Sequence, residues 1–433
     1  MEKISLKSMS GRQLDELASK IKRNNEIYTS PFEDIGKLVA KELIGDDIFS
    51  ELSVEDIRNQ FIIDNEESIP KQEQDFFIYI CKTYLLLETE PRFHLLELYQ
   101  NASDDLKKVE ENINKCHKYI KEQRQKRDNI EDEDAYRIPM FEYFIEINQN
   151  AKAEIINFIT SNKIKNLAFR KSSKFGYLYF LEILNYTYSF RQHNTIYDRY
   201  DVDKFSEFKH KFNLSPVELD ELEQLYINDR TVFWRRTQEY ITTHKIPEVI
   251  REWIKSHHRL NARRDVLAPA LDLYEKDKVL FLNLIPLQIE GIFYDYCLDI
   301  GISEKNLRSA SIGEKLDKIA ASNKILYNFE YFKFKFPLIR NKVAHGKLIS
   351  AEESINLSSL MILDLYYVCD HIVSEQDTPV NKIVKLIQKN CNKSNYIINN
   401  DIIKIIYAIL KDIKIPDFYN LQTTINTVEI ICL

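Results

Sequence analysis

One short stretch of this chain reads Phe336-Pro337-Leu338-Ile339-Arg340-Asn341-Lys342-Val343-Ala344-His345-Gly346. Pro337 suits a first helical position, because the N–H that proline lacks has no helical partner there. Gly346 suits the residue just past the end, where a left-handed turn stops a helix. Asn341 and His345 are four residues apart, so they share a face. The stretch therefore predicts a short helix on which Arg340, Asn341 and His345 are polar exceptions among residues that pack.

These side-chain types suit attack on a phosphodiester. Histidine can give or take a proton near neutral pH, and His345 would stand at a helix C-terminus, where the macrodipole favours its protonated form. The planar fork of Arg340 can hold phosphate oxygens at two points and neutralise developing charge. RNA supplies its own nucleophile, the 2′-hydroxyl, so no metal or other cofactor is required. The pattern predicts transesterification to a cyclic phosphate and a free 5′-hydroxyl.

Arg340-Asn341-x-x-Ala344-His345-Gly346 resembles the Arg-Asn-x-x-x-His signature of the HEPN superfamily. That family comprises small α-helical bundles, many of them metal-independent ribonucleases of toxins, abortive-infection systems and CRISPR effectors. An acidic residue on the long first helix is a second family feature, and Glu290 is similar to it. The resemblance covers roughly residues 270 to 375 and does not extend to the first 265.

The resemblance implies a role for each matching residue. His345 would transfer the proton, and Arg340 would bind and stabilise the phosphate. Asn341 would orient either His345 or the substrate, and Glu290 would position Arg340 or His345, with an ion pair to Arg340 as the natural arrangement; a surface position is the alternative for Glu290. Because two motifs usually form one cleft in this family, a homodimer is expected.

The bare Arg-to-His spacing is not specific. Arg251 and His257 repeat it within Arg251-Glu252-Trp253-Ile254-Lys255-Ser256-His257, but without the asparagine, the alanine and the terminating glycine. For a lone pair of this kind, a solvated arginine beside a helix-capping histidine is the ordinary explanation. The additional residues around Arg340 are what favour a site there.

The charge pattern around the motif predicts an approach for RNA. The whole chain carries a net charge of −7, which argues against a generally basic nucleic-acid coat. No acid occurs between Glu330 and Glu352, however, and this interval contains several lysines. The predicted RNA-binding residues are Lys333, Lys335, Lys342 and Lys347.

The remaining chain predicts an all-α protein. It has only 8 Gly and 11 Pro in 433 residues, and apolar residues recur at helical spacing. From 103 to 128, Leu106, Val109, Ile113, Cys116 and Ile120 form a narrow seam typical of a helical hairpin or short coiled coil. Over 268 to 300 a long helix is expected, kinked or split at Pro286.

Four regions are predicted. They are an N-terminal helical region (1–130), a second helical region that is separate or continuous with the first (135–265), a HEPN-like ribonuclease domain (268–376) and a C-terminal accessory segment (377–433). The 6 cysteines form no Cys-x-x-Cys pair, and no zinc spacing or signal-peptide core occurs. We therefore expect a cytoplasmic protein with no metal and no membrane association.

The resemblance implies a prokaryotic toxin or antiphage abortive-infection effector. Its N-terminal region would respond to a phage trigger, an antitoxin or another regulatory partner. The alternative is a non-catalytic module that binds a nucleotide or RNA, or a helical scaffold subunit of a toxin–antitoxin or defence complex. No Gly-rich phosphate loop is present, so an ATPase within this chain is not expected.

Overall fold

The computed structural model describes residues 4–5, 9–61, 69–125, 135–173, 187–194, 199–322, 326, 328–344 and 350–374. Over these residues the chain is helical, and its β contacts are isolated bridges, so the predicted all-α class is confirmed. The chain divides into two compact units, each described by itself below. Unit 1 comprises Met1–Asp128 and Phe141–Lys204, and unit 2 comprises Asn129–Met140 and Phe205–Leu433.

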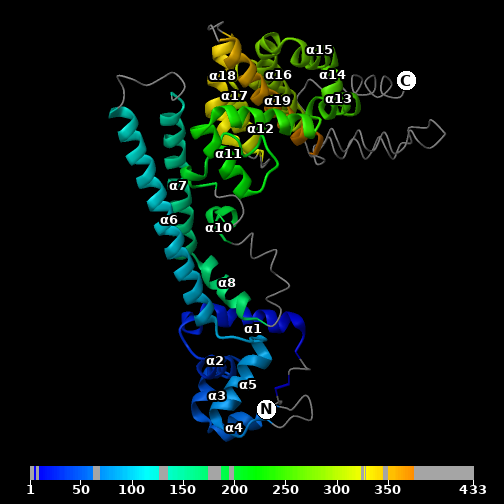
Figure 1. The fold of residues 1–433 in the computed structure, drawn as a ribbon. Coiled ribbons are helices and arrows are strands. Elements are labelled where there is room, and N and C mark those ends of the chain that lie inside the picture. Colours follow the sequence, from blue (N-terminus) through cyan, green and yellow to red (C-terminus); the bar gives the residue numbers. More distant parts are fainter. Residues whose placement is uncertain are drawn as a thin grey trace, which may run out of the picture. The chain divides into compact units, whose positions relative to one another are not determined.

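Unit 1 begins with short helices and continues into long ones (Figure 1). Its helices are α1 (Gly11–Arg23), η2 (Asn25–Tyr28), α2 (Phe32–Ile44), α3 (Asp46–Glu51), α4 (Val54–Asn59), α5 (Glu73–Leu85), α6 (Pro91–Gln125), α7 (Arg137–Thr160, in this unit from Phe141), α8 (Asn162–Ser172), α10 (Ser189–Asn194) and η6 (Val202–Lys204).

Helices α6 and α7 form the predicted helical hairpin. They lie side by side, as Figure 1 shows, and the seam residues Val109, Cys116 and Ile120 of α6 are buried. At its centre the Asn112 amide donates to the carbonyl of Tyr200 at 3.1 Å. Because α7 and α8 return along α6 and share its apolar core, residues 141–204 belong with the first region. Of the two arrangements left open for the second region, the continuous one agrees with this grouping for residues 141–204.

The first part of unit 1 depends on the close approach of α2 and α5. A Cβ added at Gly36 would lie 1.9 Å from the backbone oxygen of Phe77, so only glycine fits there. The aromatic rings of Phe76 and Phe77 are buried in the core that this approach closes.

We expect Gly36→Ala to lower the free energy of unfolding of unit 1 by roughly 3 kcal/mol, the upper end for overpacking, because backbone must move to admit the methyl group. Gly11→Ala is the matched control, since a Cβ at Gly11 meets nothing within 4 Å. That control should change stability by less than about 1 kcal/mol. Chemical denaturation followed by circular dichroism measures both, and equal stability of the two variants would contradict the close contact.

Unit 2 contains the motif helix and the helices that surround it. They are α11 (Pro216–Asn228), α12 (Arg230–Thr243), α13 (Ile246–Ser256), α14 (His258–Ala262), α15 (Arg264–Lys276), α16 (Lys278–Asp299), η7 (Glu304–Asn306), α17 (Ile312–Ala321), the π-helical turn η8 (Tyr331–Lys335), α18 (Phe336–Ala344) and α19 (Ala351–Ser374). Helices α16 and α19 pack together at its centre (Figure 1).

The helix predicted over 268–300 is divided at Asp277, and the predicted split at Pro286 is wrong, because Pro286 lies inside α16. The Asp277 carboxylate accepts from the N–H groups of Val279 and Leu280 and so starts α16. Helix α13, which precedes residue 268, packs on α19, with the Trp253 and Tyr366 rings 5.0 Å apart, and so belongs to the same compact unit.

Helix α19 is a core helix. Among the described helices it alone is long and apolar enough to cross a membrane by length and composition, but 61% of its most apolar window is buried inside the protein. The cysteines Cys81, Cys116, Cys297 and Cys369 are also buried, each as a free thiol. The C-terminal segment 377–433 lies outside the described residues.

A fully buried polar network joins three parts of unit 2. Asp364 of α19 accepts from His210 Nε2 at 2.7 Å, from the Lys211 ammonium, and from the Tyr331 hydroxyl at 2.8 Å. Asn328 lies 2.7 Å from the other ring nitrogen of His210. Burial alone would raise the pKa of Asp364, but Lys211 and His210 outweigh it and lower that pKa below its ordinary value. The network therefore holds a carboxylate and an ammonium together in the core.

His210 should make stability fall as the pH drops from about 6.5 toward about 4. Burial, followed by Lys211, lowers its pKa to about 4 against the opposing effect of Asp364, whereas an unfolded histidine titrates near 6.5. Between these values the unfolded chain binds more protons, so the free energy of unfolding decreases as pH falls and is fully retained above 6.5.

The variant His210→Gln, which keeps a donor for Asp364, isolates this effect. It should be less stable than wild type at pH 7.5 and should show a flatter pH dependence, measured by denaturation between pH 4 and 7.5. His258, with its pKa lowered to about 3, and Asp299, with its pKa raised to about 6, also contribute, but they are common to both proteins. An unchanged slope would contradict the assignment.

Candidate functional site

The motif helix is continuous with the turn before it. The Phe336 N–H donates to the carbonyl of Tyr331, five residues back, which is the π-helical pattern. Pro337 therefore lies within a continuous helical segment and does not begin it, contrary to the sequence prediction. Proline has no N–H for the carbonyl four residues earlier, and a π turn adjusts the backbone at such a place.

The base of the motif helix is fixed to the core. Tyr331 and Phe332 of η8 are fully buried, and Tyr331 donates to Asp364 in the polar network. The Phe332 ring packs 5.3 Å from that of Phe293 on α16. These contacts fix the orientation of η8 and thereby place Arg340 opposite α16.

Glu290 bridges two cations. Its Oε2 atom accepts from Arg340 Nε at 3.1 Å, which confirms the predicted ion pair. Its Oε1 atom accepts from Lys315 Nζ at 2.7 Å. With a side-chain exposure of 18%, Glu290 is not the surface residue of the alternative interpretation. One carboxylate thus ties α16, α17 and α18 together.

Sequence reasoning missed Lys315. It stands on the apolar stripe of α17 with Ile312 and Ile319, at a position where an ordinary amphipathic helix has a hydrophobic residue. Its side chain is only 7% exposed, so it requires an anionic partner inside the unit. The position of Lys315 on the apolar face of its helix could have indicated a buried ion pair from the sequence alone.

Asn341 orients the arginine. Its Oδ1 atom accepts from Arg340 NH1 at 3.0 Å, a partner different from both that the sequence predicted. The Asn341 amide nitrogen can still donate to His345 or substrate. Arg340 is 31% exposed, and within the described part of the chain its NH2 group makes no hydrogen bond. The site therefore holds the guanidinium through two of its three nitrogens, and NH2 is the nitrogen left to donate to another group.

Three of the four lysines predicted to bind RNA lie among the described residues, and their role in RNA binding stays a prediction. Each is partly buried and paired with a carboxylate that the fold brings from elsewhere in the sequence. The partners are Asp317 for Lys333, Glu207 for Lys335 and Glu353 for Lys342, at nitrogen–oxygen distances of 2.6, 3.4 and 2.6 Å. Lys335 also lies over the ring of Tyr136, 4.7 Å from its centroid. These acids reduce the positive field that the lysines would otherwise give the motif.

His345 and Lys347 lie outside the described residues, so their roles stay predictions. Over the described ranges, no three His, Cys, Asp or Glu side chains come together in a way that could hold a metal ion. Comparisons with models of protein families, with curated proteins and with solved structures find no match for this chain. Membership of the HEPN superfamily and the homodimer likewise stay predictions from the motif.

We expect substitutions of Glu290 and Lys315 to lower the free energy of unfolding by different amounts. Glu290→Gln leaves the ammonium of Lys315 without its partner, so it should lower the free energy of unfolding by roughly 2–3 kcal/mol. Lys315→Met removes a charge that needed compensation and leaves Glu290 with Arg340, so its cost should be smaller, roughly 1 kcal/mol.

The double variant Glu290→Gln/Lys315→Met should be more stable than Glu290→Gln alone, because no ammonium then remains unpaired. Chemical denaturation of all three proteins measures the coupling. Strictly additive losses would show that the two side chains do not interact.

Proposed function

We propose that unit 2 is a metal-independent endoribonuclease of HEPN type that uses the 2′-hydroxyl of RNA as nucleophile. The observation that supports this proposal is the Arg340 guanidinium, held by Glu290 at 3.1 Å and by Asn341 at 3.0 Å, while its NH2 group has no hydrogen-bond partner among the described residues. A guanidinium fixed in this way loses little conformational entropy when NH2 donates to a phosphate oxygen, and its charge can stabilise the pentacoordinate phosphorus.

His345 completes the proposed chemistry. It follows Arg340 by five residues at the end of the same helix and would move the proton between the attacking 2′-hydroxyl and the leaving 5′-oxygen. Asn341 and Glu290 are positioning residues, because they act through the arginine. We further propose a homodimeric cytoplasmic toxin or antiphage effector, in which the N-terminal region responds to a trigger or partner.

A non-catalytic RNA-binding or scaffold role is the second candidate. The carboxylates next to Lys333, Lys335 and Lys342 favour the scaffold form of this role, since they reduce the positive field that an RNA backbone would meet. Under this role, Arg340 would be a structural partner of Glu290 and nothing would be cut.

Cleavage of RNA in EDTA separates the two functions. Full-length protein should yield fragments with 2′,3′-cyclic phosphate and 5′-hydroxyl ends, and a substrate with 2′-deoxy sugars should resist. Arg340→Lys, which removes the fork but keeps the charge, should lower the rate about a hundredfold, and His345→Ala at least as much.

Arg308→Lys is the matched control, because this exposed arginine of unit 2 pairs with Glu304 away from the motif. It should cleave at the wild-type rate. If wild type and His345→Ala degraded RNA equally, the catalytic proposal would be refuted and the binding role favoured.

A further inference from the structure

A basic cavity lies in unit 1, between α1, η2 and α8. Its volume is about 680 Å³, within the usual range for small-molecule sites. Five cations line it, and no aspartate or glutamate is among its lining residues. The five are Lys22, Arg23, Lys163, Lys165 and Arg170. This concentration of positive charge is notable in a chain whose net charge is −7.

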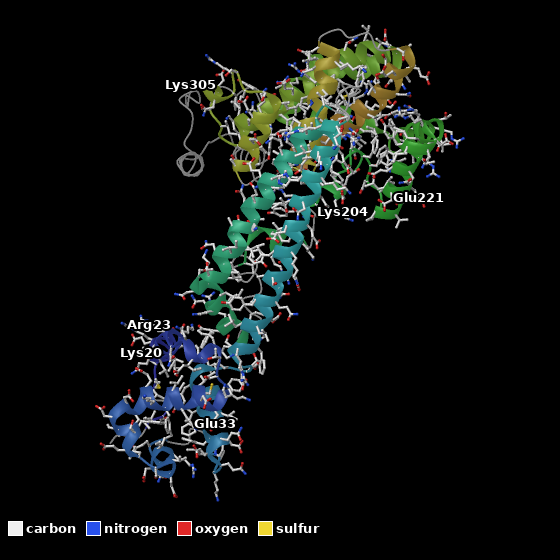
Figure 2. The ribbon with its side chains drawn as sticks, turned by 90° about the vertical axis from the view of Figure 1, so that its left-hand side faces the viewer. Lys20, Arg23, Glu33, Lys204, Glu221 and Lys305 are labelled. Atoms are coloured by element: carbon white, nitrogen blue, oxygen red, sulfur yellow. The ribbon has the colours of Figure 1, made fainter. Side chains whose placement is uncertain are left out.

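Several of these cations lack an anionic counterpart. In the part of the chain that the structure describes, Lys22, Arg23 and Lys163 form no ion pair with a carboxylate. By contrast, Lys20 on the same helix bonds to Glu42 at 2.7 Å. Figure 2 labels both Lys20 and Arg23 on α1. Like charges held this close repel one another, and an anion in the cavity would relieve that repulsion.

The pKa of Lys22 also reflects its burial and the positive charge around it. Burial, followed by the charge of Arg170, lowers the pKa of Lys22, and Asp15 opposes this only in part. The Lys22 ammonium also lies over the ring of Phe169, 4.5 Å from its centroid, which holds the chain in place. An incoming anion would therefore meet a partly desolvated and positioned ammonium.

Helix α8 adds a second favourable field. Its first turn contains no acid, and Asn162 and Lys163 from that turn line the cavity. The Ser161 hydroxyl already accepts from the Lys163 N–H at 3.3 Å, so this terminus contributes mainly through the positive end of its dipole, which attracts phosphate oxygens. The cavity thus combines the positive end of a helix with side-chain cations.

Uncharged groups extend recognition beyond phosphate. The side chains of Asn25, Asn162 and Asn166 line the cavity, and Asn25 Oδ1 accepts from Lys165 Nζ at 2.7 Å. Amides both donate and accept, so they suit sugar hydroxyls and the edges of bases. Tyr28 and Leu167 supply an apolar wall. This mixture fits a nucleotide better than a bare inorganic anion.

We propose that this cavity binds a small phosphorylated ligand of nucleotide type. The cations come from two helices, α1 and α8, and line one cavity of about 680 Å³, a size that suits a compact ligand better than an RNA strand. The inference is independent of the ribonuclease proposal, because it concerns only unit 1.

Isothermal titration of full-length protein with ATP and with inorganic triphosphate tests the proposal. Wild type should bind both, and ATP more tightly. Arg23→Gln/Lys163→Gln replaces two exposed cations that the fold does not require, and it should weaken binding about tenfold. Lys22→Gln should also weaken it. The matched control Lys20→Gln should change the affinity less than about twofold, since Lys20 does not line the cavity.

A third probe, 2′-O-methylated RNA of twelve nucleotides, shows whether the cavity binds a nucleotide or an RNA strand. The proposed ribonuclease cannot cut this RNA, so loss of catalysis does not affect the result. No binding of ATP or triphosphate overturns the proposal. Binding of the RNA alone, or equal weakening by Lys20→Gln and the cavity variants, also overturns it.

Discussion

A single buried carboxylate, that of Asp364, holds unit 2 together. It compensates the Lys211 ammonium in a place without water, and it also accepts from His210 and Tyr331. A buried ammonium without this partner would cost several kcal/mol, so these groups must meet for the unit to fold. Because Tyr331 begins the π-helical turn, the same carboxylate fixes the start of the motif helix.

The Glu290 bridge extends this constraint to the surface. Lys315 is nearly buried and demands an acid, and that acid then orients Arg340. The Asp364 network holds η8 in the core, and the Glu290 bridge holds Arg340 on the helix that follows η8. These contacts fix the orientation of the Arg340 side chain, whereas a lone surface arginine samples many rotamers.

The distribution of charge differs between the two units. In unit 2 the described lysines near the motif are paired with acids from outside the acid-free interval between Glu330 and Glu352, and these acids reduce the positive field there. In unit 1 the cavity between α1 and α8 gathers cations with no acid in its lining. Local net charge, and not the total of −7, decides where an anion can bind.

The sequence by itself determined what depends on neighbouring residues. Apolar spacing predicted the helical class and the seam of α6. The motif also predicted the Glu290–Arg340 pair. Only the tertiary structure decided the partners of Lys315, Asp364 and the motif lysines, the break at Asp277 and the grouping of 141–204 with the first region. These depend on side chains brought together from distant positions, and the spacing of residues along a chain does not specify which distant charges will meet.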